Sequence, residues 1–300
     1  MKLYGRAALA ISTVLAATFA FISPAQAAPD SVESTGRLHI LQFNVCDQYG
    51  EGTTQCTETR AQRKTEIISQ INAWGVNAVT LQEICETTYL DLRASLPAWG
   101  GTFFTTVSVT NDTRCGTNDN WGIAFIVKGS TPSSIITYYL GTENNEARYM
   151  TCGNVTVYSG FRLCSTHLSV SGPQGQVDTV RSKTLTYIVD GAAVMVGGDF
   201  NINNKTSCST GPNKLLPLYI NYYGGSTTYS CGPGTGNFRE ADQYHSGGDT
   251  YYDIATNGTK KLDYIFFNYQ RFDGSDFGAE PVYSYVSDHY VLRGAMTIFD

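Results

Sequence analysis

Short runs of apolar and β-branched residues recur along the whole chain, and Gly-, Asn- and Thr-rich stretches separate several of them. Runs of this length and composition are typical of β-strands that are buried on at least one face. We predict strands over residues 38–45, 76–82, 121–127, 161–168, 193–199, 262–267 and 290–298.

The pattern changes to helical spacing between the first two predicted strands. Ile67, Ile71 and Trp74 fall on one face of a helix, and Gly75 is placed to end it. We predict two further helices over residues 87–96 and 174–189. Strands that dominate, with helices inserted between them, predict an α/β fold in which two sheets pack face to face with helices outside.

The N-terminus has a different character. Lys2 and Arg6 precede an apolar run over residues 7–22, and small residues follow up to Ala27. This pattern predicts a signal peptide over residues 1–27, an N-terminal extension over 28–36 and a single domain over 37–300. The apolar run is shorter than the roughly 20 residues that span a membrane, and no later segment approaches that length. We therefore expect a secreted, extracellular protein without an integral membrane segment, and we expect it to be a monomer.

The net charge of the chain excludes few classes of function. The formal net charge is −6, and loss of Lys2 and Arg6 with the signal peptide makes it −8. An acidic chain is poorly suited to indiscriminate binding of nucleic acid, which relies on Lys and Arg to neutralise phosphates. The charge does not exclude an enzyme that meets phosphates through a bound cation.

All eight cysteines follow the predicted cleavage site, and none forms a Cys-x-x-Cys motif that would indicate zinc. An even number in an exported chain indicates disulfides, and 105 connectivities are open. Pairing in sequence order gives 46–56, 85–115, 152–164 and 208–231. Only the pair 152–164 has local support, because a hairpin turn at residues 158–160 would bring these two cysteines nearly opposite each other.

Polar residues that could act in catalysis or bind a metal ion lie at the ends of the predicted strands, where side chains can enter a common cleft. They are Asn44, Glu83, His167, Asp199, Asn201, Asp263, Asp288 and His289. Asp and Asn are common in turns, so each one alone has a structural explanation. Together they offer oxygen ligands that suit Mg²⁺ or Mn²⁺, and imidazoles that can transfer protons.

The same residues lie in a recognisable series of motifs. In order, these are Phe43-Asn44, Gln82-Glu83, Thr166-His167, Gly198-Asp199-Phe200-Asn201, Leu262-Asp263-Tyr264 and Ser287-Asp288-His289. From about residue 37 to 300 the chain resembles the endonuclease/exonuclease/phosphatase superfamily, whose members include deoxyribonuclease I and bacterial neutral sphingomyelinases. The resemblance implies a four-layered α/β sandwich of two mainly antiparallel sheets flanked by helices.

The resemblance also implies a role for each residue. Asn44 and Glu83 would hold the divalent cation, Mg²⁺ or Mn²⁺, and Asp288 would lie close to it or to a second ion. His289, oriented by Asp263, would take the proton of the attacking water. Asp199 would align that water, Asn201 would bind a phosphoryl oxygen, and His167 would stabilise developing charge or protonate the leaving oxygen.

Two positions depart from deoxyribonuclease I. A glutamate that pairs there with the first catalytic histidine has no equivalent in residues 118–122, and the arginine that enters the DNA minor groove is replaced in Gln82-Glu83-Ile84-Cys85.

From the motifs and the resemblance together, we expect a secreted, metal-dependent phosphodiesterase, with extracellular nucleic acid as its first substrate class. A sphingomyelinase-type or phosphoinositide-directed lipid phosphodiesterase or phosphatase is the alternative, and a non-catalytic binding module on the same fold is the third hypothesis.

Overall fold

A computed structural model describes residues 34–48, 56–107, 114–116, 118–202, 215, 217–219, 236–241, 256–258, 260–273 and 278–299. The predicted signal peptide, residues 1–27, and the predicted pair Cys208–Cys231 lie outside the described residues. In the described ranges, no helix combines the length and the apolar character needed to cross a membrane.

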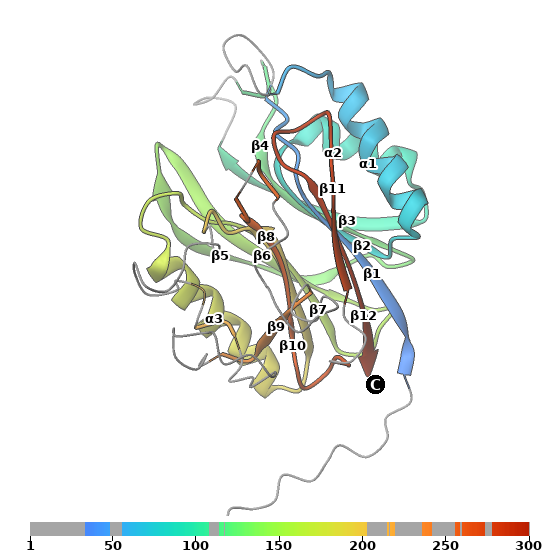
Figure 1. The fold of residues 1–300 in the computed structure, drawn as a ribbon, viewed down its shortest axis with the longest axis vertical. Coiled ribbons are helices and arrows are strands. Elements are labelled where there is room, and N and C mark those ends of the chain that lie inside the picture. The colour runs from blue at the N-terminus through green and yellow to red at the C-terminus, as the bar shows by residue number, and fades with distance from the viewer. Residues whose placement is uncertain are drawn as a thin grey trace, which may run out of the picture. The chain divides into compact units, whose positions relative to one another are not determined.

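The first sheet has six strands in the order β11-β12-β1-β2-β4-β3 (Figure 1). Their bounds are β1 Ser34–Asn44, β2 Ala78–Cys85, β3 Trp99–Val107, β4 Trp121–Lys128, β11 Gly278–Val282 and β12 Val291–Phe299. β1 and β2 run parallel, and the other neighbouring strands of this sheet run antiparallel.

The second sheet has six strands in the order β5-β6-β7-β8-β10-β9. Their bounds are β5 Ser133–Glu143, β6 Glu146–Val155, β7 Phe161–His167, β8 Ala193–Asp199, β9 Phe238–Glu240 and β10 Asp263–Asn268. β7 and β8 run parallel, and the other neighbouring pairs are antiparallel. Each sheet therefore contains one parallel pair of strands.

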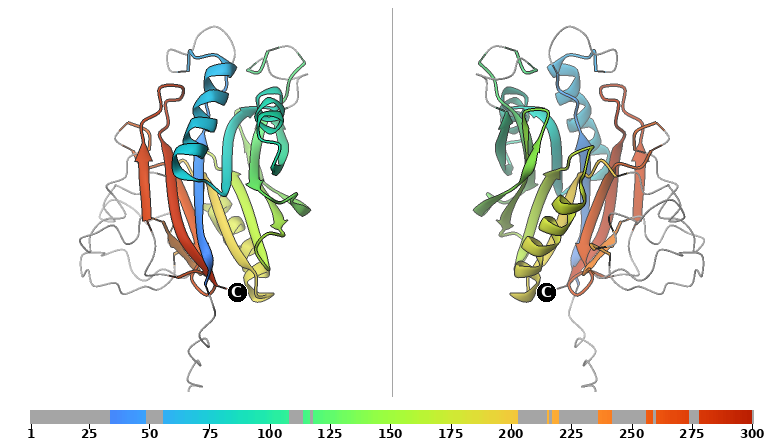
Figure 2. Two further views of the ribbon diagram at one scale, coloured as in Figure 1. Left: turned by 90° about the vertical axis from the view of Figure 1, so that its right-hand side faces the viewer. Right: turned by 90° about the vertical axis from the view of Figure 1, so that its left-hand side faces the viewer.

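Helices cover the outer faces of the two sheets. α1 (Arg60–Trp74) and α2 (Glu86–Ser95) lie against the first sheet, and α3 (Gln174–Val189) lies against the second (Figures 1 and 2). Thr59 and Gln62 form a capping box at the start of α1, and Gly75 ends the helix with a φ of 64°. The sequence therefore placed the end of α1 correctly.

Three apolar layers hold these elements together. The layer between the sheets includes Leu38, Ile40 and Phe125 from the first sheet and Leu163 and Met195 from the second. Two outer layers lie beneath α1 and α2 and beneath α3. Helices, sheet, sheet and helices form four layers, so the predicted fold class is confirmed.

The space between the sheets becomes polar toward one end of the strands. Gln42 on β1 and Gln82 on β2 are fully buried there and bond to each other, and Gln82 also donates to Ser165 of β7 at 3.1 Å. Gln42 continues this network by donating to Asp263 at 3.1 Å. Buried polar groups are costly unless they are paired, and these bonds form only at one relative position of the two sheets. The network therefore favours that position near the strand ends.

Three disulfides lie in the described part of the chain: Cys46–Cys56, Cys85–Cys115 and Cys152–Cys164. All three are pairs that sequence order predicts. Cys152 and Cys164 are directly opposite each other in the ladder of β6 and β7, as the predicted hairpin requires.

Candidate active site

The strand topology brings the predicted residues to one end of the two sheets. Asn44 ends β1 and Glu83 lies near the end of the parallel strand β2, while His167 and Asp199 end the parallel strands β7 and β8. Asp263 begins β10, which is antiparallel to β8, and it lies opposite Asp199 in the ladder. Since the carboxyl ends of parallel strands meet at one edge, the strand ends point into the same region.

His289 is oriented by a buried carboxylate. Its Nδ1 lies 2.7 Å from Oδ2 of Asp263, and its backbone N–H donates to Ser287 Oγ at 3.0 Å. Asp263 is fully buried, and its own N–H donates to Thr256 Oγ1. Burial lowers the pKa of His289, but the neighbouring Asp263 and Asp199 carboxylates outweigh burial and raise that pKa well above the usual imidazole range.

Asp199 lies at the centre of the cluster. Its Oδ2 accepts a 3.0 Å hydrogen bond from Asn44 Nδ2 and lies 3.6 Å from Nε2 of His167 and 3.7 Å from Nε2 of His289. Its Oδ1 accepts from the Asn201 N–H at 2.8 Å. Burial raises the pKa of Asp199, and the positive charge on His289 opposes that rise. Both imidazoles therefore face one carboxylate oxygen from opposite elements of the fold.

An arginine lies beside Nδ1 of His167, and the two carboxylates that approach this ring, Asp199 and Glu83, do so at Nε2. Arg148 Nη1 lies 2.9 Å from Nδ1 and 3.3 Å from Nε2 of His167. Asp119, the carboxylate within residues 118–122, pairs instead with Arg60 at 2.9 Å. Burial and the Arg148 charge together hold the pKa of His167 well below its usual range. The surroundings of His167 thus favour its neutral form, whereas the carboxylates beside His289 favour the protonated form of that ring.

Arg148 is fixed by the end of the β5–β6 hairpin. It lies 3.2 Å from Glu146 and 3.5 Å from Glu143, and Glu143 also accepts hydrogen bonds from the backbone of residues 170 and 171. These bonds tie the loop that follows His167 to the same hairpin. Sequence reasoning missed Arg148, although a charged pair at residues 146 and 148, on the strand face that continues with Met150 and Cys152, was a signal that could have found it.

Asn201 supports both His167 and Asp199. Its Nδ2 donates to the Leu168 carbonyl at 2.9 Å and lies 3.2 Å from Nε2 of His167. The residue adopts a φ of 50°, a left-handed conformation that Asn tolerates better than most residues. This turn aims the Asn201 amide back across the end of β8.

Glu83 reaches the cluster from a strand irregularity. The β2–β4 pairing shifts between Leu81 and Ile84, and Glu83 has a φ of 52°. Such a bulge redirects one side chain out of the regular alternation. The Glu83 side chain is 23% exposed, and its Oε1 lies 3.8 Å from Nε2 of His167. Partial burial raises the pKa of Glu83, while His289 and a hydrogen bond from Asn44 lower it.

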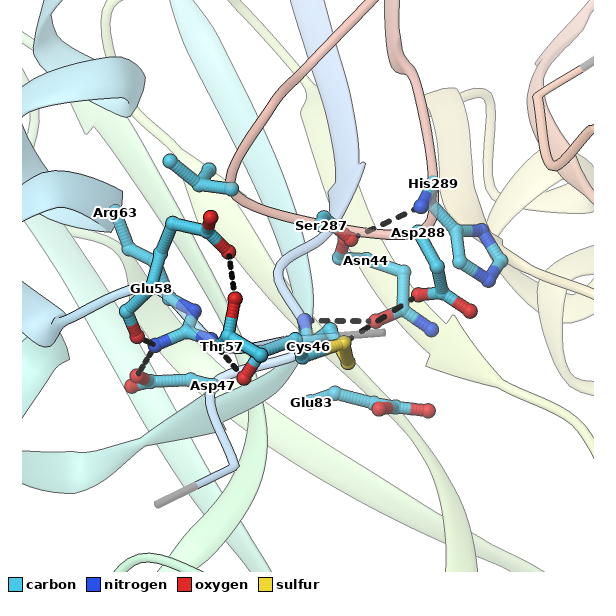
Figure 3. Close-up of a disulfide and its surroundings, with 12 residues drawn as sticks. Asn44, Cys46, Asp47, Thr57, Glu58, Arg63, Glu83, Ser287, Asp288 and His289 are labelled. Atoms are coloured by element: carbon cyan, nitrogen blue, oxygen red, sulfur yellow. Dashed lines mark hydrogen bonds and ion pairs between the residues drawn. A yellow bond between two sulfur atoms is a disulfide. The ribbon is translucent and has the colours of Figure 1, made fainter. Parts of the chain in front are cut away.

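The predicted cation ligands form one oxygen-rich group. Figure 3 shows the carboxylate of Asp288 turned toward the Asn44 amide, with the Glu83 carboxylate beneath them. Asp288 and Glu83 repel each other electrostatically, and the buried carboxylates of Asp199 and Asp263 lie nearby. When these four carboxylates are ionised, the positive charge of His289 does not balance them, and the group carries an excess of negative charge. Hard oxygen donors around such an excess fit a divalent cation.

A second group of potential ligands overlaps this one. One atom each from Asp199, Asp263 and His289 lie within 4.8 Å of one another. However, Asp263 already contacts Gln42 and His289, and Nδ1 of His289 is engaged by Asp263. Asn44, Glu83 and Asp288 are therefore the better candidates for holding the cation, and these roles stay predictions.

A family model described as Endonuclease/Exonuclease/phosphatase family matches residues 41–289. The chain belongs to this family. The matched range contains all eight predicted site residues. A search of curated protein sequences gives no significant match.

Solved structures extend the family assignment at the level of the fold. The human Nocturnin catalytic domain with bound sulfate has a TM-score of 0.61 at 19% identity, covering 87% of this chain and 94% of that one. TDP2 from D. rerio in complex with a single-strand DNA product has a TM-score of 0.54 at 15% identity, covering 87% and 98%. The mannosyl-6-phosphatase Bt3783 from Bacteroides thetaiotaomicron has a TM-score of 0.57 at 13% identity, covering 86% and 99%. At identities below 25%, these TM-scores show a shared fold alone.

Proposed function

We propose that this member of the endonuclease/exonuclease/phosphatase family is a divalent-cation-dependent phosphodiesterase whose substrate is nucleic acid. The observation that carries the proposal is the pair of imidazoles that approach Asp199 Oδ2 at 3.6 and 3.7 Å. The Asn44 amide nitrogen donates to the same oxygen, and Glu83 Oε1 lies 3.8 Å from His167. Phosphodiester hydrolysis needs a base for water on one side of phosphorus and charge stabilisation around it.

In the proposed reaction a water oxygen bonds to phosphorus, and the ester P–O bond on the opposite side breaks. Neutral His289 takes the proton of the water at Nε2, because Asp263 occupies Nδ1 and favours the imidazolium that forms. Asp199 accepts a hydrogen bond from the same water and aligns it. Asn201 donates its amide to a phosphoryl oxygen, and His167 stabilises the leaving oxygen.

Glu83, Asn44 and Asp288 are the residues proposed to hold Mg²⁺ or Mn²⁺. When bound, such a cation supplies positive charge that offsets the charge growing on the phosphoryl and leaving oxygens. This contribution matters in an acidic protein, because the formal net charge of −6 otherwise repels a phosphate backbone.

The substrate class is proposed from chemistry and from the neighbours of the fold. The D. rerio TDP2 structure holds a single-strand DNA product, which supports nucleic acid. Bt3783 is a mannosyl-6-phosphatase, so a phosphate monoester on a sugar is the second candidate. A sphingomyelin-type or phosphoinositide lipid is the third.

Export through residues 1–27 is also proposed, and the N-terminal sequence of protein recovered from culture medium tests it.

The deciding experiment is a substrate panel run with Mg²⁺, with Mn²⁺ and with excess EDTA. It includes plasmid DNA, single-stranded DNA, RNA, mannose 6-phosphate, sphingomyelin and phosphoinositides. We expect cation-dependent cleavage of nucleic acid, lost with EDTA and reduced about 10²–10⁴-fold in His289→Ala. Cation-dependent turnover of the sugar phosphate or the lipids alone would move the proposal to that class. Turnover of every substrate in EDTA would overturn the cation requirement.

His39→Gln is the matched control for the histidine variant. His39 lies on β1 five residues before Asn44, roughly 17 Å along the strand. Its Nδ1 bonds the Trp74 carbonyl at 2.6 Å, on the outer side of the sheet. We expect His39→Gln to keep wild-type turnover. Equal losses in both variants would indicate a folding defect instead of a catalytic role.

A further inference from the structure

The disulfide Cys46–Cys56 lies at the edge of the proposed cation site (Figure 3). Cys46 follows Asn44 by two residues, and Cys56 lies just before α1, beside Asp288. The bond therefore joins the segment that follows Asn44 to the segment that leads into α1, and the close-up in Figure 3 shows a sulfur beside the Asn44 amide, with a dashed line to the Asp288 carboxylate.

On one side the disulfide acts on Asn44. The Cys46 N–H donates to Asn44 Oδ1 at 3.2 Å, and Cys46 has a φ of 48°. A non-glycine residue pays about 1–2 kcal/mol for this left-handed conformation, so it persists only where its surroundings hold it. The covalent link through Cys46 Sγ is one such restraint. It keeps the N–H directed at the Asn44 amide oxygen and thereby orients that oxygen.

On the other side the disulfide contacts Asp288. Cys56 Sγ lies 3.8 Å from Asp288 Oδ1, and Asn257 Nδ2 donates to Asp288 Oδ2 at 3.3 Å. A disulfide sulfur carries no proton, so this contact is packing and not a hydrogen bond. The carboxylate is therefore held between a sulfur on one oxygen and an amide on the other. Loss of the sulfur's fixed position frees one side of the Asp288 carboxylate.

This disulfide differs from Cys152–Cys164 in what else joins its two ends. Cys152 and Cys164 are partners in the β6–β7 ladder, so backbone hydrogen bonds already hold them together. No strand pairing among the described residues joins the segment at Cys46 to the segment at Cys56. Arg63 links them by donating to the Cys56 carbonyl at 3.1 Å and lying 3.5 Å from Asp47. Arg63 therefore holds the lead into α1. The backbone on either side of Cys46 is held to β2, because the Val45 N–H donates to the Gln82 carbonyl at 2.9 Å and the Asp47 N–H donates to the Glu83 carbonyl at 2.8 Å. The disulfide is the covalent link between these two segments.

We propose that the Cys46–Cys56 disulfide is a positioning element of the cation site, so that its reduction to two thiols weakens binding of the divalent cation. The inference rests on the proposed function, because it assumes that Asn44, Glu83 and Asp288 hold the cation. A soluble phosphine such as TCEP carries out the reduction: it gives two electrons to the sulfur pair, becomes a phosphine oxide with oxygen from water, and leaves two thiols. Cys46 and Cys56 are 7% and 5% exposed, whereas Cys152 and Cys164 are fully buried, so the reductant reaches the first pair sooner.

The test measures Mn²⁺ binding by the electron paramagnetic resonance signal of free Mn²⁺, with no substrate present. Cys46→Ala/Cys56→Ala is compared with the wild-type protein and with Cys152→Ala/Cys164→Ala as the matched control. We expect the dissociation constant for Mn²⁺ to rise at least tenfold in the first variant and to stay within twofold of wild type in the control. Thermal unfolding reports stability separately, and both variants are expected to lose stability because each loses a cross-link.

The second measurement avoids any variant that fails to fold. Wild-type protein is treated with TCEP under native conditions, and alkylation followed by mass spectrometry identifies the reduced pair. We expect Cys46 and Cys56 to be reduced first, with a matching rise in the dissociation constant. Unchanged Mn²⁺ binding after this reduction, or equal losses in both double variants, overturns the positioning role. Absence of Mn²⁺ binding in the wild-type protein overturns the proposed function, and this inference with it.

Discussion

Nδ1 of His289 lies 2.7 Å from Oδ2 of Asp263, in a pair that is almost completely buried. The contact leaves Nε2 of His289 facing Asp199 at 3.7 Å. A carboxylate on the far nitrogen fixes the ring orientation and favours the protonated ring. The Asp263–His289 pair therefore sets both the direction in which His289 accepts a proton and the pH at which it can do so.

The first prediction concerns the pH profile of turnover. His289 must be neutral to accept a proton, and its pKa is raised by Asp263 and Asp199. Wild-type kcat should therefore rise with pH through and above the neutral range. In Asp263→Asn the attraction that favours the imidazolium is gone, so the acid limb should shift to lower pH. Maximal kcat should fall about 10²–10⁴-fold, because orientation of the base is lost.

The measurement is kcat against pH from 5 to 10 at saturating Mg²⁺ for the wild type and the variant. Asp178→Asn, on the exposed face of α3, is the charge-matched control and should keep the wild-type profile. An acid limb at the same pH in Asp263→Asn and wild type would show that His289 is not the group that titrates.

The second prediction concerns stability and cation binding. Burial raises the pKa of both Glu83 and Asp199, so without cation the folded state holds their protons more tightly than the unfolded state does. The stability that results is present at low pH and is lost as pH rises through the raised pKa values. At pH 8, Mg²⁺ should therefore raise Tm. At 100 times its Kd, the bound cation should add about 2.7 kcal/mol to the free energy of unfolding.

Differential scanning calorimetry with and without Mg²⁺ measures this effect. Glu83→Gln should remove most of the Mg²⁺-induced rise in Tm, because it removes a charged ligand and keeps the shape. Glu280→Gln, at a 57% exposed position on β11, should keep the full rise. A full rise in Glu83→Gln would place the cation elsewhere.

The third prediction separates the charge of Arg148 from its size. Burial and then the Arg148 guanidinium lower the pKa of His167. In Arg148→Met that pKa should move upward, since a nearby positive charge no longer opposes the imidazolium, while Arg148→Lys should keep it low. NMR titration of His167 gives the pKa directly. Turnover in Arg148→Met should fall roughly tenfold, because the group that supports His167 is lost; equal pKa values in the two variants would remove the electrostatic role.

The sequence predicted that the candidate site residues lie at strand ends, but it missed several strands of the two sheets. The strands β1, β2, β4, β7, β8, β10 and β12 were predicted from apolar runs, and all of the expected site residues lie at or near their ends. β5 was missed because most of its residues are exposed or half-buried, so it has no continuous apolar run. β3 was missed because two adjacent glycines, Gly100 and Gly101, interrupt its pattern.

Long-range polar contacts were beyond the reach of the sequence. Gln42 bonds Asp263, which is 221 positions further along the chain, and no local pattern specifies that pair. Arg148 likewise meets His167 only because β6 and β7 are neighbours in the second sheet. A side chain between two sheets is placed by the packing of both, so its partner depends on the whole fold.

The last prediction concerns Gly197, which lies two residues before Asp199 on β8. A Cβ added at Gly197 would lie 2.2 Å from Thr80 Oγ1 and 3.1 Å from Thr80 Cβ, so β8 and β2 approach each other too closely for a side chain. Gly197→Ala should lower the free energy of unfolding by about 1–3 kcal/mol through overpacking. Gly175, near the start of α3, has open space around its Cβ position, and Gly175→Ala should raise stability by about 0.4–1 kcal/mol. Urea unfolding measures both, and Thr80→Ala combined with Gly197→Ala should recover part of the loss because it removes the nearest clashing atom. Additive losses in that double variant would show that contact between the sheets is not the reason for glycine at this position.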